Sequence, residues 1–224
     1  MEQMENGIQL KPVEAWMKYC ETGCIQKKPK CAIITISSEP GSGGSIVAQK
    51  IAEEIGFDVY HRDMVKKIAE SIKITPTAID TLEKERFSGI QDFVDSLIND
   101  NYIWSGLYIE HLENALRVIT KKGKAVIVGR GANFMISRKD RLAVRVVAPL
   151  ESRIKNVMNL YAVSEDVAAK RINKREDRRK AFIKETFNEN LRNPANYDIT
   201  VNTDDLGIEG AVFSIKTLLD YYTS

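Results

Sequence analysis

The sequence predicts an α/β fold: a three-layer α/β/α sandwich in which helices cover both faces of a five-stranded parallel sheet. Short apolar runs rich in β-branched residues alternate with amphipathic segments from residue 31 onward, except across a helical stretch at 62–122. Such runs, joined by helices, are typical of parallel strands buried on both faces. A glycine-rich turn, EPGSGG at 39–44, follows the first run and precedes a helix, as in many α/β domains that bind ligands.

Length and charge limit the classes of function. The chain has 224 residues, enough for one large domain that buries about 70% of its unfolded surface. Lys and Arg number 33 against 31 Asp and Glu, so the net charge of +2 provides no global field for nucleic acid or an acidic membrane. No apolar run approaches the roughly 18 residues that span a bilayer. We therefore expect a cytoplasmic protein without nucleic-acid or membrane partners, whereas a homo-oligomer remains possible.

Residues 1–30 form an N-terminal extension whose segment PVEAWMKYC, at 12–20, is predicted to be a short helix. The chain's three cysteines are Cys20, Cys24 and Cys31. An odd number of cysteines without a second cluster favours a reducing compartment over a disulfide framework. No histidine or further cysteine lies at a zinc-like spacing from them, so we expect no metal site there.

The main domain is predicted to span 31–224. It begins with a strand, CAIITIS at 31–37, followed after the glycine turn by a helix at 45–56 and a short strand at 57–60. In the helix the apolar residues recur at spacings of three to five, and Gly56 stands where a C-terminal cap belongs.

Residues 62–122 interrupt this alternation with an all-helical insertion, in which Thr75 and Pro76 read as a cap and a first-turn proline. The alternation then resumes to the end of the chain. The predicted elements are strands at 125–131 and 141–149, helices to about residue 185, a strand at 197–203 and a closing helix at 208–222.

The glycine turn is a candidate phosphate loop. Successive backbone amides at a helix N-terminus form a concave anion site, and glycines let the chain curl closely enough. The usual pattern is G-x-x-x-x-G-K-[ST]; here Ser38 replaces the first glycine, Gly43 keeps the second, Gly44 replaces the lysine and Ser45 supplies the hydroxyl. The turn could instead merely connect a strand to a helix. Its place after the first buried strand of a parallel sheet favours phosphate binding.

A second cationic segment could supply the charge that the missing lysine leaves out. The run KRINKREDRRK at 170–180 lies on a predicted helix, and arginines three or four residues apart share one helical face. Its arginines are Arg171, Arg175, Arg178 and Arg179. Two other readings remain open: a solvated basic helix steadied by its own acidic residues, and a nucleic-acid-binding helix, although no aromatic residue interleaves with the arginines.

Three motifs together resemble the cytidylate kinase-like family, a branch of the nucleoside monophosphate kinases within the P-loop NTPase fold. They are ITIS..PGSGG near the start, VGRGANF in the middle and YDITVNT..LGIEGA near the end, and the likeness covers about residues 31–221. The absence of the usual loop lysine is typical of this branch.

The resemblance implies transfer of a phosphoryl group from ATP, with Mg²⁺, to a nucleoside monophosphate such as CMP or dCMP. It implies that residues 62–122 bind the acceptor, that 164–190 form a lid and that Arg130 of VGRG contacts the monophosphate. The ATP phosphates would be held by Gly41, Ser42, Gly43, Gly44 and Ser45, with Ser45 also binding Mg²⁺. The lid residues Arg171, Arg175, Arg178 and Arg179 would neutralise charge on the transferring group.

Some residues depart from the family pattern and keep alternatives open. At the end of the second strand His61 replaces an aspartate, and Asp63 is the nearest acid. Both are candidates for substrate binding, although His61 could equally be an exposed turn residue. Ser38, Gly44 and His61 also motivate a second hypothesis, a nucleotide-binding regulatory protein that has lost catalysis. A third is a kinase for another small phosphoryl acceptor.

Overall fold

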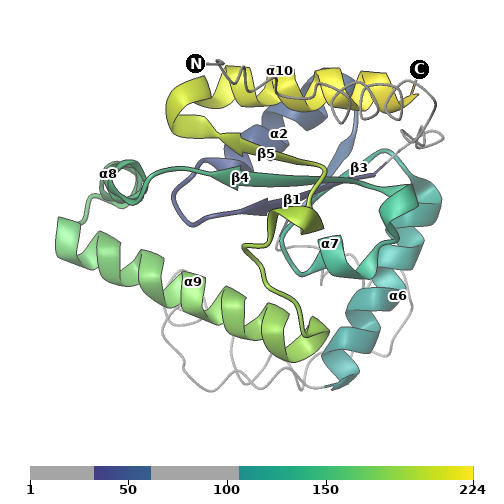
Figure 1. Ribbon diagram of the computed structural model, residues 1–224, viewed down its shortest axis with the longest axis horizontal. Coiled ribbons are helices and arrows are strands. Elements are labelled where there is room, and N and C mark those ends of the chain that lie inside the picture. Colours follow the sequence, from purple (N-terminus) through teal and green to yellow (C-terminus); the bar gives the residue numbers. More distant parts are fainter. Residues whose placement is uncertain (1–32, 62–105, 224) are drawn as a thin grey trace, which may run out of the picture.

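The computed structural model describes residues 33–61 and 106–223, and in them the predicted α/β/α sandwich is confirmed (Figure 1). The described strands are β1 (Ile33–Ser38), β2 (Asp58–Tyr60), β3 (Ala125–Val128), β4 (Leu142–Val147) and β5 (Ile199–Asn202). They form one parallel sheet in the order β2-β3-β1-β4-β5. The N-terminal extension, most of the predicted insertion and Asp63 lie outside the described residues.

Strand β1 lies at the centre of the sheet, because its apolar β-branched residues are suited to burial on both faces. It pairs with β3 on one side and β4 on the other, with Ile36 opposite both Val128 and Val144. The connection that leaves β1 runs towards β2, and the connection that leaves β3 runs towards β4, so the two diverge between β1 and β3. In an open α/β sheet, ligands bind beyond the carboxyl ends of the strands at such a position.

Each face of the sheet carries its own hydrophobic cluster. Helices α2 (Gly44–Ile55) and α10 (Thr203–Thr223) cover one face, where Val47, Ile51 and Ile215 pack against β1 and β4. Helices α6 (Gly106–Lys122) and α7 (Ala132–Met135) cover the other face. In the described part of the predicted insertion, residues 106–122 are thus helical.

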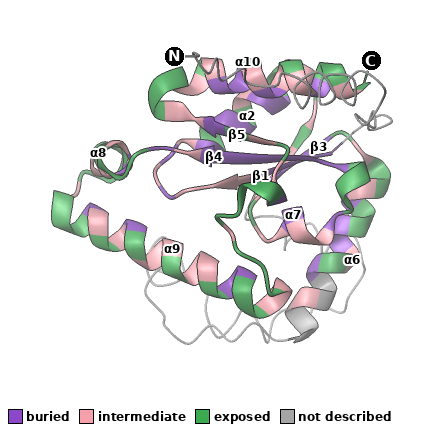
Figure 2. Cartoon of the chain, in the orientation of Figure 1, coloured by how far each residue is buried: buried purple, intermediate pink, exposed green. Residues whose placement is uncertain are grey.

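Helices α8 (Leu150–Tyr161) and α9 (Glu165–Phe187) lie at the edge of the molecule, joined to each other through Val157, Ala168 and Ile172. Figure 2 shows that buried residues dominate the central strands β1, β3 and β4, whereas most of α9 is exposed or half-buried. None of the helices in residues 33–61 and 106–223 has the length and apolar character needed to cross a membrane.

The predicted end of one strand was wrong. The strand expected at 125–131 ends at Val128, because Gly129, Arg130 and Gly131 all have left-handed backbone angles, with φ of 73°, 58° and 68°. The closing helix predicted from 208 is confirmed: Gly207, whose φ of 65° and ψ of −177° are not helical, separates it from a preceding helical turn that begins at Thr203. Two short 3₁₀ helices, at Arg138–Asp140 and Pro194–Asn196, were not predicted.

Candidate functional site

The glycine turn forms a tight loop between the end of β1 and the start of α2. Gly41 and Gly43 have φ values of 86° and 75°, which side-chain-bearing residues rarely adopt. A Cβ atom at Gly41 would lie 2.6 Å from the carbonyl oxygen of Arg153. Glycine is therefore required at position 41 both by the backbone angle and by the close approach of α8.

Three side chains hold the loop in shape. Ser42 is buried, and its hydroxyl lies 2.9 Å from the carbonyl oxygen of Glu39 and 3.2 Å from that of Val146. The side-chain amide of Asn156 donates to the carbonyl of Gly41 at 2.9 Å. The hydroxyl of Thr203 donates to the carbonyl of Ser42 at 2.8 Å. The loop carbonyls are thus bound by other parts of the fold.

Among the described residues, three of the loop amides lack a backbone acceptor, whereas the amide of Ser42 donates to the carbonyl of Glu39. In the described part of the chain the backbone hydrogen bonds provide no acceptor for the amides of Gly43, Gly44 or Ser45. Unpaired amides are expected in the first turn of a helix, where the helix dipole also favours negative charge. The side chain of Ser45 is exposed beside them. This arrangement fits a phosphate group.

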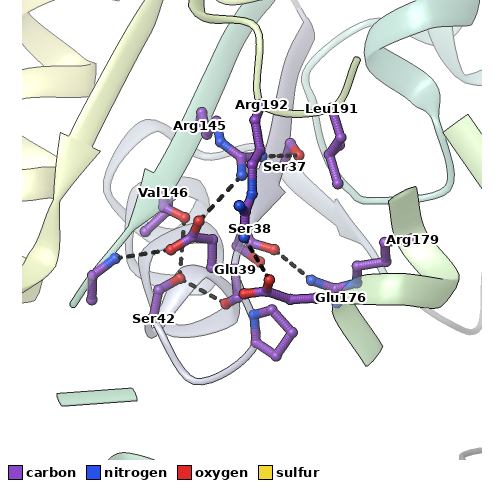
Figure 3. A network of polar contacts seen from close by, with 12 residues as sticks. Ser37, Ser38, Glu39, Ser42, Arg145, Val146, Glu176, Arg179, Leu191 and Arg192 are labelled. Carbon is purple, nitrogen blue, oxygen red and sulfur yellow. Dashed lines mark hydrogen bonds and ion pairs between the residues drawn. The ribbon is translucent and has the colours of Figure 1, made fainter. Parts of the chain in front are cut away.

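Helix α9 brings Arg179 to the same place. The guanidinium of Arg179 donates to the carbonyl oxygen of Ser38, at the start of the loop (Figure 3). Arg175 lies close enough to Arg179 to influence its ionisation. Arg171 instead lies over the ring of Tyr161, 5.7 Å from its centroid, at the end of α8. Arg178 is half-buried on the same helix.

A cluster of positive charge surrounds Arg179. Burial, together with the charges of Arg175, Arg145 and Arg130, lowers the pKa of Arg179 to about 10, against the opposing effect of Glu176. Like charges reduce a pKa in this way only when they lie near one another. Arg130, Arg145 and Arg175 therefore lie near Arg179.

Buried ion pairs tie α9 to the loop. Arg153 of α8 donates to Glu176 of α9 at 2.6 Å, and its Nε lies 3.5 Å from the carboxylate of Glu39 in the loop. Arg192 also donates to Glu176, at 2.7 Å. Burial alone would raise the pKa of Glu176, but the hydrogen bond and charge of Arg153, with the charges of Arg192 and Lys180, hold that pKa below its ordinary value.

The sequence of this chain is similar to that of a known family. The model of the cytidylate kinase-like family matches residues 33–205, which is more than half of the chain. The chain belongs to the cytidylate kinase-like family.

Two curated relatives are similar over most of their length. The cytidylate kinase of Methanocaldococcus jannaschii is 26% identical over 198 residues, covering 84% of this chain and 97% of that protein. The cytidylate kinase of Ignicoccus hospitalis is 26% identical over 188 residues, covering 84% of this chain and 98% of that protein. Membership of this family implies a nucleotide kinase.

A solved structure supports the fold. The crystal structure of an uncharacterized protein from Eubacterium ventriosum superposes with a TM-score of 0.63 at 22% identity, covering 84% of this chain and 98% of that one. At this level of identity the likeness concerns the fold of the cytidylate kinase-like domain alone.

The cytidylate kinase-like motif VGRG lies at the carboxyl end of β3, directly beside β1. Arg130 has a left-handed φ of 58° between Gly129 and Gly131, and its charge acts on Arg179. A Cβ atom at Gly131 would lie 2.7 Å from the ring of Phe187, the last residue of α9. His61 follows β2, at the same edge of the sheet, and is half-buried.

The residues present are compatible with Mg²⁺ bound through phosphates. No group of three or more His, Cys, Asp or Glu side chains that could hold a metal ion occurs in residues 33–61 and 106–223. Mg²⁺ usually keeps several waters and takes only one or two protein ligands besides the substrate phosphates. The exposed hydroxyl of Ser45, at the start of α2, is of the type that fits this role.

The sequence motifs did not single out four residues of the site: Glu39, Arg145, Arg153 and Arg192. Arg145 carried one signal, because a charged residue inside an otherwise apolar strand must find a partner when the strand is buried. The other three depend on pairs between segments far apart in the sequence. Such pairs are visible only in the folded chain.

Proposed function

We propose that this protein transfers the γ-phosphoryl group of ATP to a nucleoside monophosphate, CMP or dCMP. One observation carries the proposal: Arg179 of the basic helix α9 contacts the carbonyl of Ser38, next to loop amides that have no acceptor in the described chain. Arg179 and the loop amides therefore lie near one another at the carboxyl end of β1. The family and its curated relatives support a nucleotide as the anion.

Phosphoryl transfer needs alignment and distributed positive charge more than a protein nucleophile. The loop from Gly41 to Ser45 holds the ATP phosphates, chiefly through the amides of Gly43, Gly44 and Ser45. Arg175 and Arg179 stabilise charge on the transferring group. Arg171 and Arg178 extend this cationic face along α9. Arg130 holds the phosphate of the acceptor from the end of β3. His61, and Asp63 outside the described residues, are the remaining candidates for binding the acceptor.

Mg²⁺, when bound, neutralises the developing charge between the outer phosphates. Ser45 supplies the hydroxyl that orients it. Helix α9 excludes water from the reacting groups, which prevents hydrolysis of ATP when no acceptor is present.

One observation favours a second candidate, a nucleotide-binding regulator without turnover. Gly44 is buried against Ser38, so the loop has no room for the lysine that usually meets the outer phosphates. Such a protein would bind ATP through the same amides and arginines without transferring the phosphoryl group.

A coupled ADP assay at high protein concentration tests both candidates with CMP, dCMP, UMP and AMP as acceptors. Formation of ADP that depends on CMP or dCMP supports the kinase and removes the regulator. Silence with all four, combined with ATP binding by calorimetry, supports the regulator. Silence without binding contradicts both, whereas turnover with AMP or UMP alone overturns the choice of acceptor.

A further inference from the structure

Arg145 is a charged residue at the centre of the sheet to which no role has been given so far. It lies on β4, opposite Ser37 of β1, and is only 5% exposed. Burying a guanidinium is costly unless it is well paired and hydrogen-bonded. The quality of its contacts therefore indicates whether Arg145 serves the fold alone.

Its contacts within the described chain are long. Nη1 lies 3.3 Å from the hydroxyl of Ser37 and Nη2 lies 3.4 Å from Glu39. Charge-assisted hydrogen bonds are usually about 2.7 to 2.9 Å long. Glu39 is also shared, since Arg153 and the amide of Ala148 approach its other oxygen at 3.5 Å. The carboxylate thus does not fully satisfy Arg145.

The guanidinium is nevertheless held in place. It lies over the ring of Tyr197, 5.5 Å from the centroid, and the hydroxyl of Tyr197 donates to the carbonyl of Leu191 at 2.8 Å. A cation over an aromatic face is attracted to it and loses part of its freedom to rotate. Arg145, which lies on β4, is thus oriented by the ring of Tyr197.

Arg145 also lines a small cavity beside the phosphate loop (Figure 3). The charged residues around this cavity are Glu39, Arg145, Glu176, Arg179, Lys180 and Arg192. Positive charges exceed negative ones there. The cavity, at about 10 Å³, has room for about one water molecule. The cavity is therefore too small for a phosphate group unless the residues around it move.

We propose that Arg145 is a further phosphate-binding residue, which supplies from the sheet the positive charge that Gly44 cannot supply from the loop. This inference rests on the proposed function only because it takes the triphosphate of a nucleotide as the ligand. When Arg179 moves away from Ser38, Arg145 and Arg179 grip the same outer phosphate from opposite sides. Because Arg145 stays on the strand, its charge is in position before the nucleotide arrives.

The test uses inorganic tripolyphosphate, without metal, as the probe for wild type, Arg145→Met and the matched control Arg138→Met. Arg138 is exposed and donates only to the carbonyl of Ala195 among the contacts described. We expect Arg145→Met to weaken tripolyphosphate binding by about 10- to 100-fold in calorimetry. The salt dependence of binding should also weaken, because one charge fewer meets the anion. The control should bind as wild type does.

A purely structural role would lower the melting temperature but leave the affinity and the salt dependence of the folded protein unchanged, and that result overturns the proposal. If Arg145→Met does not fold, Arg145→Gln, which keeps amide donors for Ser37 and Glu39, replaces it with the same expected loss. If neither variant folds, Arg145 serves the fold and the proposal is wrong.

The outcome is separable from that of the kinase assay. A wild type that binds tripolyphosphate through Arg145 but forms no ADP upholds this inference while the kinase proposal fails. If wild type forms ADP and Arg145→Met binds tripolyphosphate as tightly as wild type does, the kinase proposal is upheld and this inference fails.

Discussion

Ser38 occupies the space that a side chain at Gly44 would need: a Cβ atom at Gly44 would overlap the Cβ of Ser38 and lie 2.7 Å from its hydroxyl oxygen. The end of β1 and the start of α2 are therefore packed together at these two positions. In the usual phosphate loop they hold glycine and lysine. Here the larger of the two residues lies at position 38 and the glycine lies at position 44.

This exchange gives a prediction about restoring the lysine. Gly44→Lys alone should destabilise the protein by about 1 to 3 kcal/mol, because it overpacks the contact with Ser38. The double variant Ser38→Gly/Gly44→Lys should recover most of that loss and bind ATP at least as tightly as wild type. Urea unfolding and calorimetry provide the two measurements. Equal stability of the single and double variants would contradict the steric explanation.

The arginines of α9 should differ in importance. Arg179→Ala should reduce kcat by about 10³-fold, as expected for an arginine that stabilises the transferring group. Arg171→Ala should reduce it at least tenfold less, since Arg171 lies over Tyr161 rather than over the loop. Steady-state kinetics of both variants, with melting temperatures as controls for folding, would decide this. Equal losses in kcat would show that the positive charge of the whole helix, rather than Arg179 in particular, stabilises the transferring group.

Glu176 should link stability to pH. Its pKa is held below the ordinary value of 4.5 in the folded protein, so its contribution is present above that pH and is lost as the pH falls through the folded pKa. Glu176→Gln should destabilise the protein by about 1 to 3 kcal/mol at pH 7, because it removes the carboxylate that Arg153 and Arg192 share. The difference from wild type should shrink as the pH falls below 4.5. A gap that is unchanged between pH 7 and pH 3 in urea unfolding would rule this linkage out.

Two glycines around Arg130 form a matched pair. Gly129→Ala should cost about 1 to 2 kcal/mol from its left-handed backbone alone, since nothing lies within 4 Å of the added Cβ. Gly131→Ala should cost about 1 to 3 kcal/mol more, because its Cβ meets the ring of Phe187. Thermal unfolding of the two variants compares them directly. Gly131→Ala should also raise the KM for the acceptor if Arg130 binds its phosphate, whereas an unchanged KM would argue against that role.

Local sequence patterns were sufficient for much of the fold. The apolar run at Ile33–Ile36 identified the central strand, and Gly56 was expected to cap the first helix of the main domain, where its φ is 68°. These features depend on residues within one or two turns of each other. Burial and backbone angle are set there by side-chain type alone.

The VGRG segment shows where such patterns fail. Three successive left-handed residues end β3 early, yet an arginine between two glycines within an apolar run looks like a continuing strand. The ring of Phe187 leaves no room for a side chain at Gly131, and that contact joins residues 56 positions apart. The same limit applies to Arg153, whose two carboxylate partners lie on the loop and on α9.

The contacts of Asn156 and Thr203 with the loop carbonyls bear on heat resistance. Because α8 and the start of α10 shape the loop, its conformation melts together with the whole domain rather than by itself. Any polyphosphate that recognises only the intact loop must then raise the melting temperature in proportion to the logarithm of its concentration above its dissociation constant. The nucleotide level of the surroundings thereby becomes one of the factors that decide how long the chain survives a thermal challenge.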